Sequence, residues 1–195
     1  MRRFSGVVAV AAGLLLVVNV ASATTLTFAT FADPSGSAAT PMFWMNEDLT
    51  LVRAEYFGPG LTLQVPFTGQ VFHNVTFKMP QLSIDDTGAS GPGWIQFNDG
   101  VDALMTITFQ SARLTEFGFG ARNRPTDPNN VNIIYHGLPV VPDLSEESFA
   151  FSFTNFNEIG FGWITTTASF TSSAIPEPAT VVFLLVGGLA LIRRR

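Results

Sequence analysis

Between Thr25 and Ala174, apolar side chains recur at every second position, and this alternation constrains the fold more than any other feature of the chain. It is clearest at Phe149, Phe151 and Phe153, which place three rings on one face. A strand turns successive side chains to opposite faces, so a period of two indicates strands with one buried face. Nowhere in 24–175 do apolar residues keep the three- and four-residue spacing of a helix, and the sequence therefore predicts an all-β region.

Turn residues interrupt the alternation about every eight to twelve residues, the spacing typical of all-β domains. Asn98-Asp99-Gly100 has the composition of a hairpin turn, because Asp and Gly tolerate positive φ. We expect about ten strands and an antiparallel β-sandwich of jelly-roll type over residues 24–174. The segment Pro41–Asp48 is predicted as a loop, and Ile159, Phe161 and Trp163 are predicted as one face of a strand. Pro66 is predicted within a strand, at an edge position or a bulge where its missing donor costs nothing.

Residues 1–23 have the composition of a secretory signal. Two arginines precede the apolar run Gly6–Val18, and Ala21 and Ala23 are the small residues that signal peptidase reads. A run this short falls below a hydrocarbon core of about 30 Å. We expect a signal helix that is cleaved after Ala23; an uncleaved N-terminal anchor is the alternative.

Residues 175–195 fall into three parts. The first is Pro176, Glu177 and Pro178, an extended segment because proline fixes φ and lacks an N–H donor. The second is an apolar run over 179–192, 14 residues that reach about 21 Å as a helix, short for a stable transmembrane helix. The third is a basic end that stays in the cytoplasm by the positive-inside rule, formed by Arg193, Arg194 and Arg195.

This tripartite tail resembles the PEP-CTERM sorting signal, with Pro176-Glu177-Pro178 as its recognition motif. The resemblance covers only about 20 residues at the end of the chain. It implies a bacterial protein that is exported across the inner membrane, held transiently by the transmembrane helix and processed by an exosortase. It also implies release to the cell surface or an exopolysaccharide-containing matrix. An ordinary C-terminal membrane anchor is the alternative.

Charge and composition exclude several classes of protein. The chain has no Cys, which excludes disulfides, thiolate metal sites and a cysteine nucleophile. Residues 24–175 carry 5 basic and 14 acidic side chains, a net charge of −9, which argues against binding of nucleic acid. We expect the nearest basic neighbours in sequence, Arg113, Arg122 and Arg124, to be solvated or paired and not to form a patch.

The candidates for catalysis are three pairs of acids at turn-like positions, Asp85-Asp86, Asp99 with Asp102, and Glu146-Glu147. A glycosidase needs two carboxyl groups facing each other about 5 to 9 Å apart. Asp is common in turns because it hydrogen-bonds its own backbone, so we expect these acids to be structural. His73 and His136 lack the nearby partners of a catalytic triad or a metal cluster.

Two weaker candidates concern binding. Oxygen ligands from Asp127, Asn129 and Asn130 suit a calcium ion, although no EF-hand spacing is present. Trp44 is a candidate for stacking on a sugar ring. We expect an exported, non-enzymatic surface or matrix protein with a structural or adhesive role, associated with polysaccharide. The alternative is a carbohydrate-active enzyme or a calcium-dependent glycan-binding module on the same fold.

Overall fold

Thirteen strands and no helix make up the part of the chain that the structure, a computed structural model, describes: residues 25–32, 40–66, 68–136 and 144–176. No helix in these ranges has the length and apolarity needed to cross a membrane. The strands are β1 (Leu26–Phe31), β2 (Phe43–Asn46), β3 (Leu51–Tyr56), β4 (Thr62–Val65), β5 (Gln70–His73), β6 (Thr76–Ser83), β7 (Gly93–Asp99), β8 (Asp102–Phe109), β9 (Arg113–Thr115), β10 (Gly118–Arg122), β11 (Val131–Tyr135), β12 (Leu144–Gly160) and β13 (Trp163–Pro176). The described region is therefore all-β, as predicted.

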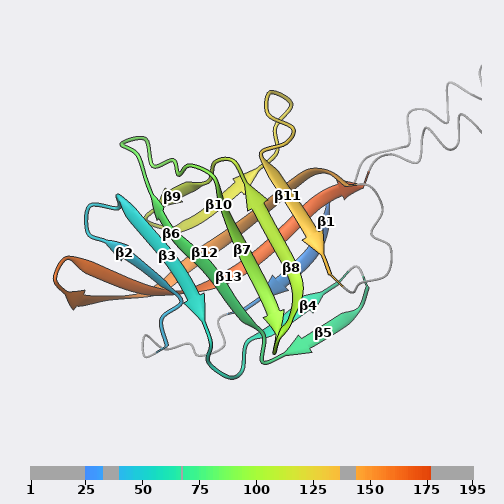
Figure 1. The fold of residues 1–195 in the computed structure, drawn as a ribbon, viewed down its shortest axis with the longest axis horizontal. Coiled ribbons are helices and arrows are strands. Elements are labelled where there is room, and N and C mark those ends of the chain that lie inside the picture. Colours follow the sequence, from blue (N-terminus) through green and yellow to red (C-terminus); the bar gives the residue numbers. More distant parts are fainter. Residues whose placement is uncertain (1–24, 33–39, 67, 137–143, 177–195) are drawn as a thin grey trace, which may run out of the picture. The chain divides into compact units, whose positions relative to one another are not determined.

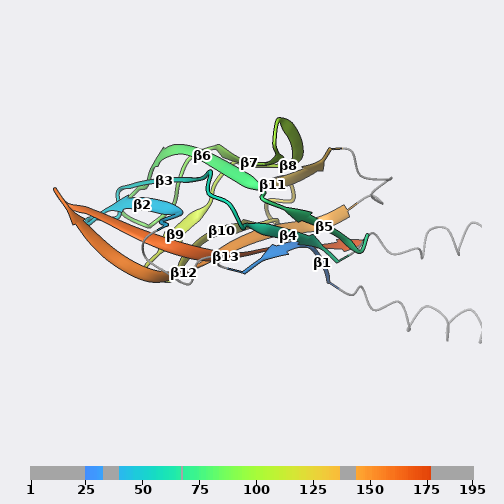
Figure 2. The ribbon, with the colours of Figure 1, turned by 90° about the horizontal axis from the view of Figure 1, so that it is seen from below.

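All thirteen strands belong to one antiparallel sheet. Its main path runs β11-β8-β7-β6-β3-β2-β13-β1-β4-β5, and β12 pairs with β13 and carries β10 and then β9 (Figure 1). The long strand β13 pairs with β2 near its start and with β1 near its end. Figure 2 shows β3, β6, β7 and β8 on one side of the molecule and β1, β12 and β13 on the other.

A cluster of phenylalanine rings fills the space between these two sides. Phe151 of β12 lies 4.8 Å from Phe170 of β13 and 5.8 Å from Phe77 of β6, measured between ring centroids. Phe31 of β1 lies 5.9 Å from Phe77. All four rings are buried. The three rings that alternate along 149–153 therefore share one face, as the period of two predicts.

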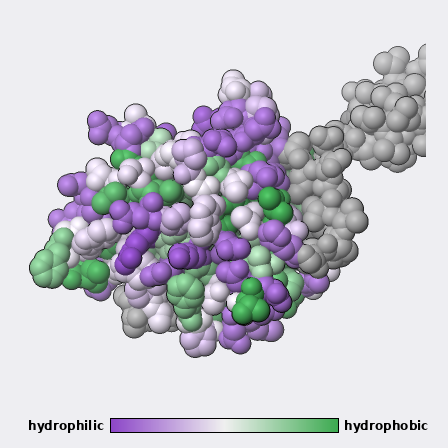
Figure 3. Space-filling view, in the orientation of Figure 1, coloured by the Kyte–Doolittle hydropathy of each residue, from purple (hydrophilic) through white to green (hydrophobic). Residues whose placement is uncertain are grey.

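β12 and β13 form a long hairpin whose tip lies outside the core. Gly160, Phe161 and Gly162 all have positive φ, and they reverse the chain there. Phe156, Ile159 and Phe161 are exposed on this hairpin. Figure 3 shows the apolar surface that results at the left end of the molecule. Phe161 thus belongs to the turn, so its predicted place beside Ile159 and Trp163 on a strand face is wrong.

Two other local predictions are corrected. The predicted loop Pro41–Asp48 contains strand β2, in which Phe43 and Met45 are buried, because tertiary pairing with β3 and β13 outweighs the weak local signal. Pro66, expected inside a strand, follows the last residue of β4 and is exposed. The signal segment with Ala21 and Ala23, and the tail from Glu177 to Arg195, lie outside the described residues.

Candidate functional site

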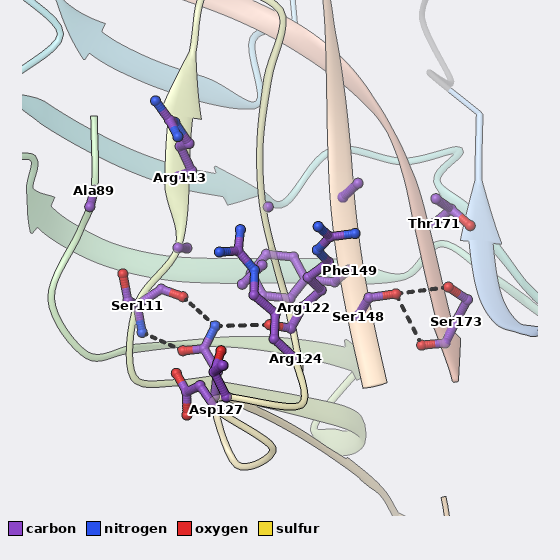
Figure 4. A pocket seen from close by; sticks show the side chains of 16 residues that line it. Ala89, Ser111, Arg113, Arg122, Arg124, Asp127, Ser148, Phe149, Thr171 and Ser173 are labelled. Carbon is purple, nitrogen blue, oxygen red and sulfur yellow. Dashed lines mark hydrogen bonds between the residues drawn. The ribbon is translucent and has the colours of Figure 1, made fainter. Parts of the chain in front are cut away.

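A surface hollow of about 740 Å³ lies over β10, β12 and β13 (Figure 4). Its lining includes small residues that these strands turn outward, among them Gly120 and Ala150, which face each other across β10 and β12. Gly120 has to be a glycine here, since a Cβ on it would lie 2.6 Å from the carbonyl oxygen of Phe149. The hollow exists because these positions carry little side-chain volume.

Three arginines line this hollow, and strand register explains why two of them share a face. Arg113 on β9 is the register partner of Gly120 on β10. Arg122 follows Gly120 by two residues, so its side chain projects from the same face of the sheet. Diagonal neighbours of this kind lie about 7–8 Å apart between Cα atoms. Figure 4 shows Arg113, Arg122 and Arg124 around the same depression.

Arg124 is held by a tight turn after β10. Its N–H donates to the carbonyl oxygen of Asp127 at 3.0 Å, and the Asp127 N–H donates back to the carbonyl of Arg124 at 2.9 Å. These reciprocal bonds close the turn Arg124–Asp127. Asp127 also lines the hollow, so one carboxyl group lies among the three cations.

Two asparagine side chains fix the loop that carries Arg124. Asn130 accepts from the Ser111 N–H at 2.8 Å and donates to the carbonyls of Ser111 at 3.0 Å and Arg122 at 3.2 Å. Asn123 accepts from the Val131 N–H at 2.6 Å and donates to its carbonyl at 2.9 Å. Both ends of the loop are therefore tied to neighbouring backbone.

The three guanidinium groups have no partner in the described part of the chain: none forms an ion pair or a side-chain hydrogen bond there. Arg113 does act through space on Asp85. The pKa of that carboxyl lies below its usual range, first because of hydrogen bonds from Thr87 and Ala89 and then because of the Arg113 charge. The hollow thus presents positive charge that nearby acids do not neutralise by contact.

The arginine cluster corrects the expectation that these side chains do not form a patch. Sequence spacing placed Arg113 and Arg122 nine positions apart, with no indication of a shared face. Reading 113–122 as a two-stranded hairpin with its turn at Glu116-Phe117 would have paired Arg113 with Gly120 and found the relationship. Arg124 could not be placed this way, because the turn that positions it depends on side-chain bonds from Asn130 and Asn123.

The paired acids lie at separate places in the fold. The Asp85 carboxylate accepts three hydrogen bonds within its own turn, from Thr87 N, Thr87 Oγ1 and Ala89 N, at 2.8, 2.6 and 2.9 Å. Asp99 and Asp102 are register partners at the β7–β8 hairpin. Glu146 is exposed and Glu147 is buried on β12. The three pairs are not brought together into one site.

The calcium candidates are only partly available as ligands. Asn130 is buried, and its carboxamide is engaged with backbone groups on both its oxygen and its nitrogen. Asp127 and Asn129 are exposed on the same loop. No group of three or more acids or histidines suited to a metal occurs among the described residues.

Trp44 and His73 lie on strands and His136 follows β11, and none of the three lines the hollow. Trp44 on β2 is half-buried, and the Arg53 guanidinium carbon sits 5.1 Å from the centroid of its ring. His73 lies on β5, with its Nδ1 3.3 Å from Thr62 Oγ1. The Nε2 of His136 lies 3.0 Å from Thr106 Oγ1.

Comparison with known proteins finds no matching family model, no matching curated protein and no matching solved structure.

Proposed function

We propose that this chain is an exported, non-enzymatic protein of the bacterial surface or extracellular matrix, with a structural or adhesive role and contact with polysaccharide. Its described part would be a two-layered β-sandwich of jelly-roll type. The core favours this arrangement, because rings from β6 and β7 contact rings from β1, β12 and β13. Sandwiches of this kind bury the inner faces of two sheets in just this way.

The observation that carries the proposal is the hollow with three unpaired arginines. Positive charge and hydroxyl groups suit binding of a ligand, whereas glycoside hydrolysis needs two facing carboxyl groups. Among the described residues, Asp127 is the one acid that lines the hollow. A binding role therefore fits this site better than the carbohydrate-active enzyme that is the alternative.

Export and sorting rest on the two ends of the chain. We propose that signal peptidase removes 1–23, and that an exosortase processes the chain at Pro176-Glu177-Pro178 while 179–192 is in the membrane. Leu26 at the start of β1 is the register partner of Ala174 near the end of β13. Both proposed sorting segments thus join the described region at neighbouring residues, which suits a chain that is held at one membrane.

Intact-mass measurement of the exported product tests the sorting proposal. We expect an N-terminus at Thr24 and a product without Arg193–Arg195. Substitution of Glu177 by Gln should leave unprocessed chain in the membrane fraction, since the recognition motif is altered. An exported product that retains the three C-terminal arginines would contradict exosortase processing.

A further inference from the structure

The unpaired arginines stand out because the rest of the region is acidic. Residues 24–175 carry 5 basic and 14 acidic side chains, and three of the five cations line one hollow. Arginine presents a planar fork of donors that matches the two oxygens of a carboxylate. Three such groups around one depression, with no ion pair among the described residues, therefore form a site for an anion.

The shape of the site suits an extended ligand. A second hollow, of about 490 Å³, shares Arg122, Arg124 and Ser148 with the first and continues to Thr25 and Ile175. Because the two depressions have these residues in common, they form one continuous groove along the ends of β10, β12 and β13. A single small ion would occupy only part of it.

The lining also contains hydroxyl groups. Thr126 and Thr171 are exposed in the first hollow. Ser148 and Ser173 lie beside them, with their Oγ atoms 2.8 Å apart. Hydroxyl groups both donate and accept, so they match a ligand that is itself rich in hydroxyls. Of the described residues that line the two hollows, Phe149 alone is aromatic, and it is buried.

These features favour a sugar acid over a nucleic acid. Proteins that bind single-stranded nucleic acid offer exposed aromatic rings for base stacking, and the described lining of this groove has none. Two acids, Asp127 and Glu146, also lie along the groove, where the three arginines outnumber them. A hydroxylated chain with carboxylate groups fits both the arginines and the hydroxyl groups of the lining.

We propose that the groove lined by Arg113, Arg122 and Arg124 binds a segment of an acidic polysaccharide, with the guanidinium groups paired to uronate carboxylates. This inference rests on the proposed function and names its ligand class. The arginines supply the affinity, and Thr126 and Thr171 contact sugar hydroxyls. Salt weakens the interaction, because exposed charges are screened at distances beyond about 10 Å at 0.1 M ionic strength.

The test is a titration of the full chain, held in nanodiscs of zwitterionic phosphatidylcholine, with a hexamer of galacturonate. A neutral galactose hexamer and a single-stranded oligothymidylate are titrated in parallel. The variants are Arg113→Gln and Arg122→Gln. Lys78→Gln on β6 is the control, since it removes one exposed positive charge from a strand that does not line the groove.

We expect binding of the galacturonate hexamer alone, weakened roughly fivefold to tenfold by each arginine substitution and less than twofold by Lys78→Gln. The affinity should fall as salt is raised. Four results would overturn the inference. They are equal binding of the neutral hexamer, tighter binding of oligothymidylate, an equal loss of affinity in all three variants, and no binding at all. Unchanged melting temperatures show that the variants fold. If the tail were processed normally but galacturonate did not bind, the proposed ligand class would be wrong and the sorting proposal would still stand.

Discussion

The side chain of Glu147 on β12 accepts a hydrogen bond from the backbone N–H of Ile133 on β11, with Oε2 3.1 Å from the nitrogen. β11 pairs with β8 on its other side, so this carboxyl group covers an edge that would otherwise leave a donor unpaired. Glu147 is only 7% exposed. Burial raises its pKa to about 7, and the bond from Ile133 opposes this shift in part.

Stability should therefore decrease as the pH rises through neutrality. The pKa of Glu147 is higher in the folded protein than the ordinary 4.5, so the protonated form is favoured by folding. Its stabilising contribution is complete below pH 4.5 and is lost as the pH rises through about 7, at most on the order of 3 kcal/mol. Glu147→Gln keeps an acceptor for Ile133 and cannot ionise. Urea unfolding at pH 5 and pH 8 should show a smaller difference in the variant.

The exposed neighbour Glu146 supplies the control for that experiment. Glu146→Gln removes the same charge without changing the contact with Ile133. It should retain the pH dependence of the unmodified protein. If the stability of Glu147→Gln and of Glu146→Gln depended on pH in the same way, the buried carboxyl group would not be the source of that pH dependence.

Phe151 should be the most costly ring to remove. Its ring lies within 6.3 Å of five others, those of Phe31, Phe43, Phe77, Phe149 and Phe170. Phe151→Ala should lower the free energy of unfolding by about 3–5 kcal/mol, because it leaves a cavity at the centre of the core. Phe161→Ala removes the same ring from the exposed hairpin tip and should cost less than about 0.5 kcal/mol. Denaturant titration of the two variants compares them directly.

Gly118 should not tolerate a side chain. A Cβ at this position of β10 would run into the carbonyl oxygen of Phe151 on β12. Gly118→Ala should therefore push the two strands apart and destabilise the protein by roughly 2–4 kcal/mol, as overpacked positions do. Gly91→Ala is the matched control, since a Cβ there meets nothing within 4 Å. Similar melting temperatures for the two variants would contradict close strand packing at Gly118.

Asn130 should matter for the loop and hence for the groove. Asn130→Ala removes three hydrogen bonds to Ser111 and Arg122 and leaves partly buried backbone groups without these partners, at a cost of about 1–3 kcal/mol. Asn129→Ala changes an exposed neighbour and should be close to neutral. Hydrogen exchange of the Ser111 amide, measured in both variants, should accelerate only in Asn130→Ala.

The all-β class could be predicted from the sequence because alternation is a local property. Phe149, Phe151 and Phe153 are buried as their spacing predicts, and the turn at Asn98-Asp99-Gly100 joins β7 to β8, with Gly100 at a φ of 62°. β2 was missed because four residues carry too little pattern. What makes it a strand is its pairing with β3 and β13, whose residues are distant in sequence.

The sequence by itself determined the periodicity, the turns, the acidic charge and the two distinctive ends, since each depends on residues close together in the chain. Only the tertiary structure decided that Arg113, Arg122 and Arg124 share one groove, because that depends on β9–β10 register and on side-chain bonds that close a loop. It also decided that the carboxyl group of Glu147 is buried against β11 and not solvated at a turn. The register between strands that are distant in sequence decides which charged side chains lie together, and the local sequence pattern does not predict that register.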